Sequence, residues 1–216
     1  MCCNFPETVS RTASQQSCTD RNSYTSGLLE GSPERAREFT GFTSDKPVIM
    51  IIGGSLGAAA VNDAVRAVLH ELLKNFQIIH LCGKGKLDES FKDTKGYVQY
   101  EYIKKELADL FALADIVISR AGANAICELS ALKKPNLLIP LSARASRGDQ
   151  ILNARSFERM GYSVVLEEEE ITNEKLVDII NSLYKGRAAY TEAMSKSKLT
   201  DSIEEIVQLF EQAVNR

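Results

Sequence analysis

The feature that most constrains the fold of this chain is a regular alternation of short apolar runs and segments with helical periodicity, which begins at Lys46. The run 47–52 ends at two glycines, and such a short, wholly apolar run is typical of a strand buried on both faces. Apolar residues then recur at helical spacing from Val61 to Leu72. Further strands are expected at 76–82, 97–102, 115–119, 136–140 and 163–166, and further helices at 105–113, 124–132, 149–160, 173–184 and 201–215. Strands that alternate with helices imply right-handed crossovers, so we predict one doubly wound α/β domain with a parallel sheet.

Residues 1–46 differ in character from the rest. The stretch 11–26 is polar and has neither helical nor strand periodicity, which predicts loop or disorder. A short helix is expected over 33–39, because Ser32 can cap it and Pro33 suits the first helical position. We therefore expect an N-terminal tail or linker at 1–46 that does not belong to the domain, and a ligand-binding domain at 47–216.

Composition argues against several classes of function. The formal net charge of -3 lacks the basic excess with which nucleic-acid binders neutralise phosphates, so no nucleic-acid partner is expected. No apolar run reaches the roughly 18 residues of a membrane-spanning helix, and the N-terminus has no secretory-signal pattern. The five cysteines follow neither a disulfide framework nor a zinc pattern, which fits a reducing cytoplasm.

A glycine-rich loop at 53–57 (Gly-Gly-Ser-Leu-Gly) follows the first strand and opens a helix. Glycines permit close approach of the backbone to a ligand, and a helix N-terminus offers free N–H groups to phosphate. Ser55 can add a hydroxyl donor. The pattern is neither a P-loop nor the dinucleotide G-x-G-x-x-G, so a tight turn without a ligand is an equal alternative.

The segment 119–128 (Ser-Arg-Ala-Gly-Ala-Asn-Ala-Ile-Cys-Glu) repeats this arrangement at a second strand end. Glu128 lies about one turn into the helix, where its carboxylate could accept hydrogen bonds from two ribose hydroxyls; the alternative is a carboxylate stabilised only by the helix dipole. Arg120 could reach a phosphate or pair with a surface acid. Ligands of doubly wound sheets bind beyond the carboxyl ends of the strands, which marks the loops 53–57, 83, 120–124 and 141–150.

Other polar residues complete the inventory. Gln150 and Asn153 could read sugar hydroxyls, whereas Asp149 could cap the helix that follows. His80 lies within an apolar strand, so we expect a hydrogen-bonded core residue rather than a catalytic one. The acidic run 167–170 is expected to be a solvated turn. No D-x-D motif stands beside the glycine loops, so neither a bound metal nor a cofactor is implied.

Taken together, these segments resemble the C-terminal half of the MurG family, glycosyltransferase family 28. Members of that family move GlcNAc from UDP-GlcNAc to lipid I (undecaprenyl-diphospho-MurNAc-pentapeptide) and so make lipid II for peptidoglycan. The resemblance covers about residues 28–215, and its matching motifs are 53–58 with Asn62, His80 with Gly83, 114–124 with Glu128, Pro135 with 138–141, and 146–154.

The resemblance implies a Rossmann-like fold that forms one half of a GT-B glycosyltransferase, the half that binds UDP-GlcNAc. It implies that Ser55 contacts the diphosphate, that the main chain at Ile103 meets the uracil, and that Glu128 holds the ribose. Gln150 would touch the GlcNAc. The expected UDP-GlcNAc contacts are Gly54, Ser55, Gly57, Ile103, Arg120, Gly122, Ala123, Asn124, Ala125, Ile126, Cys127, Glu128 and Gln150.

The chain departs from the family in two respects. The half that carries the acceptor-binding face and the residues proposed to deprotonate the acceptor is absent, so no catalytic residue is expected here and the chain alone should be inactive. A G-N-P-x-R-like segment normally precedes Gly27, but 19–26 read differently, while 4–7 resemble the family again, as a reading-frame error or a decayed gene would leave them.

These departures leave alternatives to the MurG-like function. The chain could be a binding module that pairs with a separately encoded acceptor half, or part of a lipid glycosyltransferase that uses UDP-glucose or UDP-galactose on diacylglycerol. In the full-length family enzyme, the expected location is cytoplasmic, peripheral on the inner face of the cell membrane.

Overall fold

A computed structural model describes residues 27–54, 58–143, 145 and 148–196 of the chain. Its centre is a six-stranded sheet in the order β3-β2-β1-β4-β5-β6, in which all neighbouring strands pair in parallel. The strands are β1 (Val48–Ile52), β2 (Gln77–Leu81), β3 (Tyr97–Tyr100), β4 (Ile116–Ser119), β5 (Asn136–Leu138) and β6 (Ser163–Val165). The predicted doubly wound, Rossmann-like parallel sheet is therefore confirmed.

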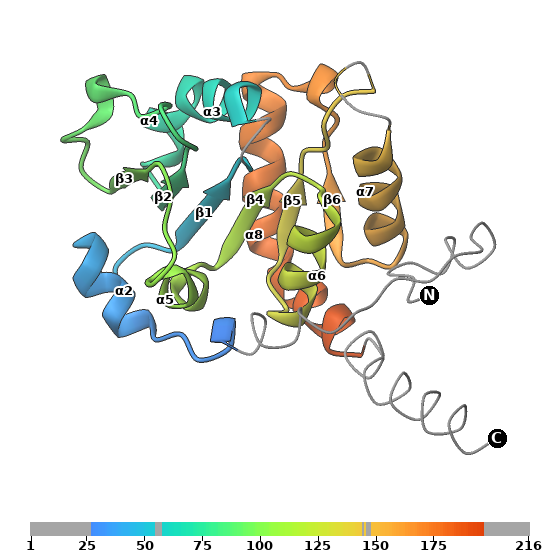
Figure 1. The fold of residues 1–216 in the computed structure, drawn as a ribbon, viewed down its shortest axis with the longest axis horizontal. Helices are drawn as coiled ribbons and strands as arrows, with labels where there is room; N and C mark the ends of the chain where they lie inside the picture. The colour runs from blue at the N-terminus through green and yellow to red at the C-terminus, as the bar shows by residue number, and fades with distance from the viewer. Residues whose placement is uncertain (1–26, 55–57, 144, 146–147, 197–216) are drawn as a thin grey trace.

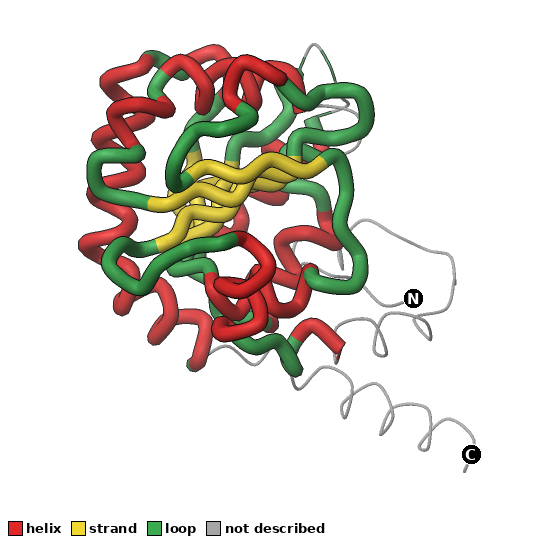
Figure 2. Tube along the Cα trace, turned by 90° about the vertical axis from the view of Figure 1, so that its left-hand side faces the viewer, coloured by secondary structure: helices red, strands yellow, loops and turns green. Residues whose placement is uncertain are grey.

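Helices cover both faces of this sheet (Figures 1 and 2). One face is covered by α2 (Pro33–Thr40), α5 (Leu107–Leu113), α6 (Ala123–Ala131) and α7 (Asp149–Arg159), the other by α3 (Ala58–Ala67), α4 (Leu69–Leu72) and α8 (Asn173–Ser195). Two short 3₁₀ turns, η2 (Glu89–Phe91) and η3 (Glu168–Glu170), lie in the connections. In the part of the chain that the structure describes, no helix is long and apolar enough to cross a membrane.

The sheet separates two hydrophobic clusters, because successive side chains of a strand point to opposite faces. In β1, Met50 lies in the cluster under α5 and α6, whereas Ile49 and Ile51 lie in the cluster under α3 and α8. All three side chains are 0% exposed. Burial on both faces is the physical reason why this strand is apolar at every position.

Most helix ends lie within two residues of their predicted positions, but two predicted helices differ by more. The helical pattern from Val61 to Leu72 is divided between α3 and α4 by a turn at Val68, which keeps the apolar positions buried. Helix α8 continues past Tyr184 to Ser195. Its second half lacks a continuous apolar stripe, but Met194 reaches the core cluster of the opposite face. The predicted helix at 201–215 lies outside the described residues.

The segment 27–46 is packed on the domain, so the expectation that it lies outside as a tail is wrong for these residues. Helix α2 packs against α5, and Leu28, Ala36 and Phe42 belong to the core cluster on that face. Burial of apolar side chains is the dominant favourable term in folding, and it holds this segment in place. The irregular stretch 11–26 lies outside the described residues.

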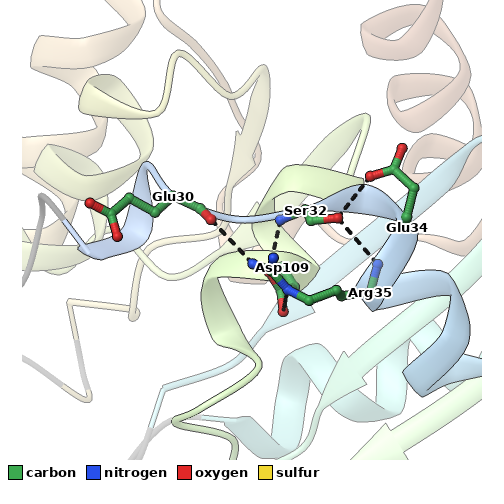
Figure 3. Close-up of polar contacts among 5 residues, drawn as sticks. All are labelled: Glu30, Ser32, Glu34, Arg35 and Asp109. Carbon is green, nitrogen blue, oxygen red and sulfur yellow. Dashed lines mark hydrogen bonds and ion pairs between the residues drawn. The ribbon is translucent and has the colours of Figure 1, made fainter.

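A polar cluster around Asp109 of α5 fastens the start of α2 (Figure 3). Arg35 donates through Nε to Oδ2 of Asp109 (3.0 Å) and through Nη2 to Oδ1 (2.6 Å). The main-chain N–H of Ser32 also donates to Oδ1 (2.7 Å), while the Ser32 hydroxyl accepts from the Arg35 amide, as a helix cap. The prediction of a helix capped by Ser32 is thus confirmed.

Candidate nucleotide-binding site

The sheet has its topological switch point between β1 and β4. From β1 the chain proceeds outward through β2 and β3, and it then returns to the other side of β1 as β4. Ile52 and Ser119 are register partners at the carboxyl ends of these strands. The loops that follow β1 and β4 therefore leave the sheet side by side, and such a crevice is where doubly wound folds bind their ligands.

The loop after β1 begins with Gly53 and Gly54. Gly54 has a φ of +73°, a conformation that glycine adopts without strain, and apart from its chain neighbours no described residue has an atom within 4 Å of where a Cβ would stand. The backbone is thus open to a close approach at this position. Ser55 and Gly57, which the sequence predicts as ligand contacts, lie outside the described residues.

Helix α6 begins directly at the switch point with a glycine, which has no side chain that could cap the helix N-terminus. Its N-cap residue is Gly122, and the first turn contains no acidic side chain. The first hydrogen bond within the helix runs from Ile126 N to Gly122 O (3.1 Å). The amides of Ala123, Asn124 and Ala125 therefore find no main-chain acceptor among the described residues. Free N–H groups and the helix dipole together favour an anion or another acceptor.

Glu128 follows in α6 as a half-buried carboxylate. Burial raises its pKa, and no hydrogen bond or ion pair joins it to another described residue. A partly desolvated acid without a partner costs folding free energy, so its presence is better explained by a ligand than by stability. The helix dipole explains this carboxylate less well, because Glu128 lies beyond the first turn of α6, where the dipole effect has become weak. Its neighbour Cys127 is also half-buried.

Ile103 lies between β3 and α5, with its side chain 7% exposed in the same core cluster as Ile126. Neither its N–H nor its C=O makes a hydrogen bond with a described residue. A buried side chain thus holds an unpaired donor and acceptor in place, as recognition of a base edge requires. Nothing in the local sequence marks this position, because unpaired main-chain groups become visible only in the fold.

Arg120 is buried at the end of β4, with 6% of the residue exposed. Its Nη1 donates to the carbonyls of Ile139 (3.2 Å) and Pro140 (3.1 Å), and the same atom lies 2.5 Å from Oε2 of Glu168. Of the two alternatives for Arg120, pairing with an acid is the one present in the structure. A phosphate contact by Arg120 stays a prediction.

The acidic run 167–170 is not simply solvated, which corrects the sequence expectation. Glu167 pairs with Arg155, Glu168 with Arg120, and Glu170 with Lys175. The 3₁₀ turn at 168–170 brings these carboxylates to cations from different elements, and sequence spacing alone does not reveal such pairs. Over the described ranges, no group of three or more His, Cys, Asp or Glu residues is arranged to hold a metal ion.

Helix α7 tethers two loops of the ligand edge. Gln150 accepts a hydrogen bond from the N–H of Leu141 (3.1 Å), and Asn153 donates to the carbonyl of Ala121 (3.0 Å). The side-chain amide nitrogen of Gln150 has no partner among the described residues and remains a candidate donor to a sugar hydroxyl. Asp149 is the first helical residue and Gly148 is the N-cap, so the expected capping role of Asp149 is wrong.

His80 is a core residue, as predicted. It is 0% exposed, and its ring nitrogens contact the Tyr97 hydroxyl (2.8 Å) and Oδ1 of Asn62 (2.9 Å). The sequence interpretation missed this pairing with α3. A signal was present, since Asn62 interrupts an apolar helix face next to Val61.

Comparison with known proteins agrees with a nucleotide-binding site at this edge of the sheet. Residues 48–209 match the family model described as the glycosyltransferase family 28 C-terminal domain. The chain is 54% identical, over 97% of its length, to the UDP-N-acetylglucosamine--N-acetylmuramyl-(pentapeptide) pyrophosphoryl-undecaprenol N-acetylglucosamine transferase of Lachnospira eligens. It is 50% identical, over 100% of its length, to the transferase of the same name from Clostridium perfringens. The chain spans 59% and 60% of the lengths of these two relatives.

Solved structures show the same kinship. A crystal structure of MurG from Acinetobacter baumannii superimposes with a TM-score of 0.66 at 26% identity, over 94% of this chain and 58% of that one. The calicheamicin glycosyltransferase CalG4 superimposes with a TM-score of 0.60 at 15% identity, over 81% of this chain and 43% of that one, which shows the fold alone. By its sequence and its structure, the chain belongs to the glycosyltransferase family 28 C-terminal domain family.

Proposed function

We propose that this chain is the donor-binding part of a glycosyltransferase that moves GlcNAc from UDP-GlcNAc to lipid I, with lipid II as the product. The observation that carries the proposal is the N-terminus of α6 at the switch point, which has a glycine as its N-cap, with the carboxylate of Glu128 behind it, which pairs with no described residue. Free amides suit an anionic nucleotide, and a partly desolvated acceptor suits ribose hydroxyls. The names of the two bacterial relatives support this choice of donor and acceptor.

The donor would lie across the switch point. The diphosphate would meet Gly54, Ser55 and Gly57, and the nucleoside would follow α6 from Gly122 to Glu128. The uracil edge would pair with the main chain of Ile103. The other contacts proposed for the donor are Arg120, Ala123, Asn124, Ala125, Ile126, Cys127 and Gln150.

The domain proposed to bind the donor is 47–216, and the α2 segment packed on it adds to its core. The proposed chemistry is an inverting displacement. An acceptor hydroxyl oxygen bonds to the anomeric carbon of GlcNAc, the bond from that carbon to UDP breaks, and the hydroxyl proton passes to a base outside this chain. Fixed dipoles of helix N-termini stabilise the negative charge that develops on UDP, and they need no reorganisation during the reaction. The full-length enzyme would act peripherally on the inner face of the cell membrane.

Calorimetry of the whole chain with UDP, UDP-GlcNAc and UDP-glucose in the presence of EDTA tests the proposal. We expect UDP and UDP-GlcNAc to bind without added metal, and UDP-glucose to bind more weakly than UDP-GlcNAc. Binding that disappears with EDTA would contradict the proposed helix-end contacts. A preference for UDP-glucose would favour a lipid glycosyltransferase that acts on diacylglycerol.

A single substitution tests the ribose contact. Glu128→Ala should weaken UDP binding about tenfold or more, because charge-assisted hydrogen bonds are worth about 1.5–3 kcal/mol each and 1.4 kcal/mol is one decade of affinity. Glu174→Ala is a matched control, because Glu174 is an exposed glutamate in the first turn of α8 on the other face of the sheet. If UDP affinity of a folded Glu128→Ala variant stays within about twofold of wild type, the ribose assignment is wrong.

A further inference from the structure

A chain of buried polar side chains fastens α3 to the sheet. Asn62 of α3 donates through Nδ2 to the carbonyl of Cys82 (3.0 Å), and its Oδ1 lies 2.9 Å from Nε2 of His80. Nδ1 of His80 lies 2.8 Å from the Tyr97 hydroxyl on β3. Asn62 is 1% exposed, His80 0% and Tyr97 3%, so water competes for none of these contacts. The chain thus runs from α3 across β2 to β3.

The hydrogen-bond directions leave one arrangement of protons. Because Nδ2 of Asn62 donates to Cys82, its Oδ1 is an acceptor and Nε2 of His80 must donate to it. Nδ1 of His80 is then unprotonated and accepts from the Tyr97 hydroxyl. Each of the three side chains is thus fixed as a donor or an acceptor in every contact, so a shift of α3 would break a buried hydrogen bond.

A second attachment lies one turn further along α3. Arg66 donates through Nη2 to the carbonyl of Lys86 (2.7 Å) and to Oε1 of Gln99 on β3 (3.1 Å). Residues four apart lie on one side of a helix, so Asn62 and Arg66 tie the same side of α3 to β2, to β3 and to the segment that joins them. The apolar contacts of Val61 and Val65 are non-directional, whereas these hydrogen bonds fix the rotation and height of the helix.

We infer that Asn62, His80 and Tyr97 are positioning residues for the diphosphate end of the donor site. The inference rests on the proposed function, in which the glycine loop before α3 meets the diphosphate. Amide-to-phosphate contacts tolerate only a few tenths of an ångström, and the effect of a helix end acts within its first turn. When both partners of a buried hydrogen bond are replaced by apolar groups of the same shape, the stability can be nearly unchanged, so the polar chain here fits a demand for exact placement of α3.

The test compares two ligands that differ only in the diphosphate. Uridine and UDP are titrated by NMR into the whole chain and into Asn62→Leu, which removes both hydrogen bonds at similar volume. We expect the affinity for UDP to fall by about fivefold or more, the equivalent of one ordinary hydrogen bond, while uridine affinity stays within about twofold. Val65→Ala is the control, since it weakens the packing of α3 but leaves the polar chain intact and should preserve the UDP-to-uridine ratio.

Tyr97→Phe is the second variant, because it removes only the hydroxyl at the far end of the chain. Like Asn62→Leu, it should lower the ratio of UDP affinity to uridine affinity. If Asn62→Leu does not fold, Tyr97→Phe alone tests the inference. A ratio within about twofold of wild type in every folded variant of the polar chain overturns the inference. A wild-type chain that does not bind UDP overturns the proposed function itself, so the two failures are distinguishable.

Discussion

Burial of His80 should make the fold acid-sensitive well above the pH at which carboxylates protonate. Desolvation, and then the nearby Arg66 guanidinium, lower the pKa of His80 from 6.5 to about 3. The unfolded chain binds a proton below pH 6.5 and the folded chain does not, so the contribution to stability is complete above pH 6.5 and is lost as the pH falls. A pH of 5 lies 1.5 units below the unfolded pKa of 6.5. At 1.36 kcal/mol per unit, the free energy of unfolding therefore falls by about 2 kcal/mol.

This loss depends only on the unfolded pKa as long as the folded ring stays neutral at pH 5. The groups near the ring favour the neutral imidazole, because Asn62 and Tyr97 are uncharged partners and the Arg66 cation would repel a protonated ring. Urea unfolding followed by far-UV circular dichroism at pH 7.5 and pH 5 measures the difference in free energy of unfolding for wild type and His80→Gln. The wild type should lose about 2 kcal/mol more than His80→Gln over this interval.

The other histidine of the chain provides the control. His70 is exposed on α4, so His70→Gln leaves the buried imidazole in place and should show the wild-type pH dependence. Equal losses in wild type and His80→Gln, to within about 0.5 kcal/mol, would refute the reasoning. Such a result would mean that His80 takes up its proton in the folded state, which is incompatible with the proton arrangement deduced for Asn62 and Tyr97.

Three further predictions concern other parts of the fold. Glu128→Gln should raise rather than lower the melting temperature at pH 7.5, because burial raises the pKa of this acid, which pairs with no described residue; a lower melting temperature would assign it a structural partner. Gly31→Ala should cost about 1–3 kcal/mol in a urea titration, since its Cβ would stand 2.0 Å from the carbonyl oxygen of Ala108, whereas Gly27→Ala meets no atom within 4 Å and should be neutral. Asp109→Ala should lower the melting temperature by several degrees, and by more than Arg35→Ala, because Asp109 also accepts from the Ser32 amide; equal effects would limit its role to the ion pair.

Local patterns determined the architecture of this protein. The wholly apolar run of β1 is explained by burial on two faces, and its position before a glycine pair identified a strand that feeds a helix. The spacing of apolar residues distinguished helices from strands because the two structures have periods of 3.6 and 2. Ser32 and Pro33 marked the start of α2 because capping depends on neighbours a few residues apart.

Part of the candidate site was equally accessible from the sequence. The loop at 53–57 and the segment 119–128 each follow a strand and open a helix, and a parallel sheet brings its strand ends to one edge. The sequence could not show that Arg120 is buried against two carbonyls and Glu168, because that pair joins residues 48 positions apart. Nor could it show that the main chain of Ile103 pairs with no described residue, since every residue except proline carries the same N–H and C=O groups.

Tertiary structure alone decided three matters. It packed α2 on α5 through Asp109, which moved residues 27–46 from an expected tail into the domain. It extended α8 to Ser195, where Met194 reaches the core of the opposite face. It also joined Asn62, His80 and Tyr97 into one buried chain. The physical reason is common to all three: periodicity and capping are local and are written along the chain, whereas burial and long-range hydrogen bonds depend on which distant residues meet in space.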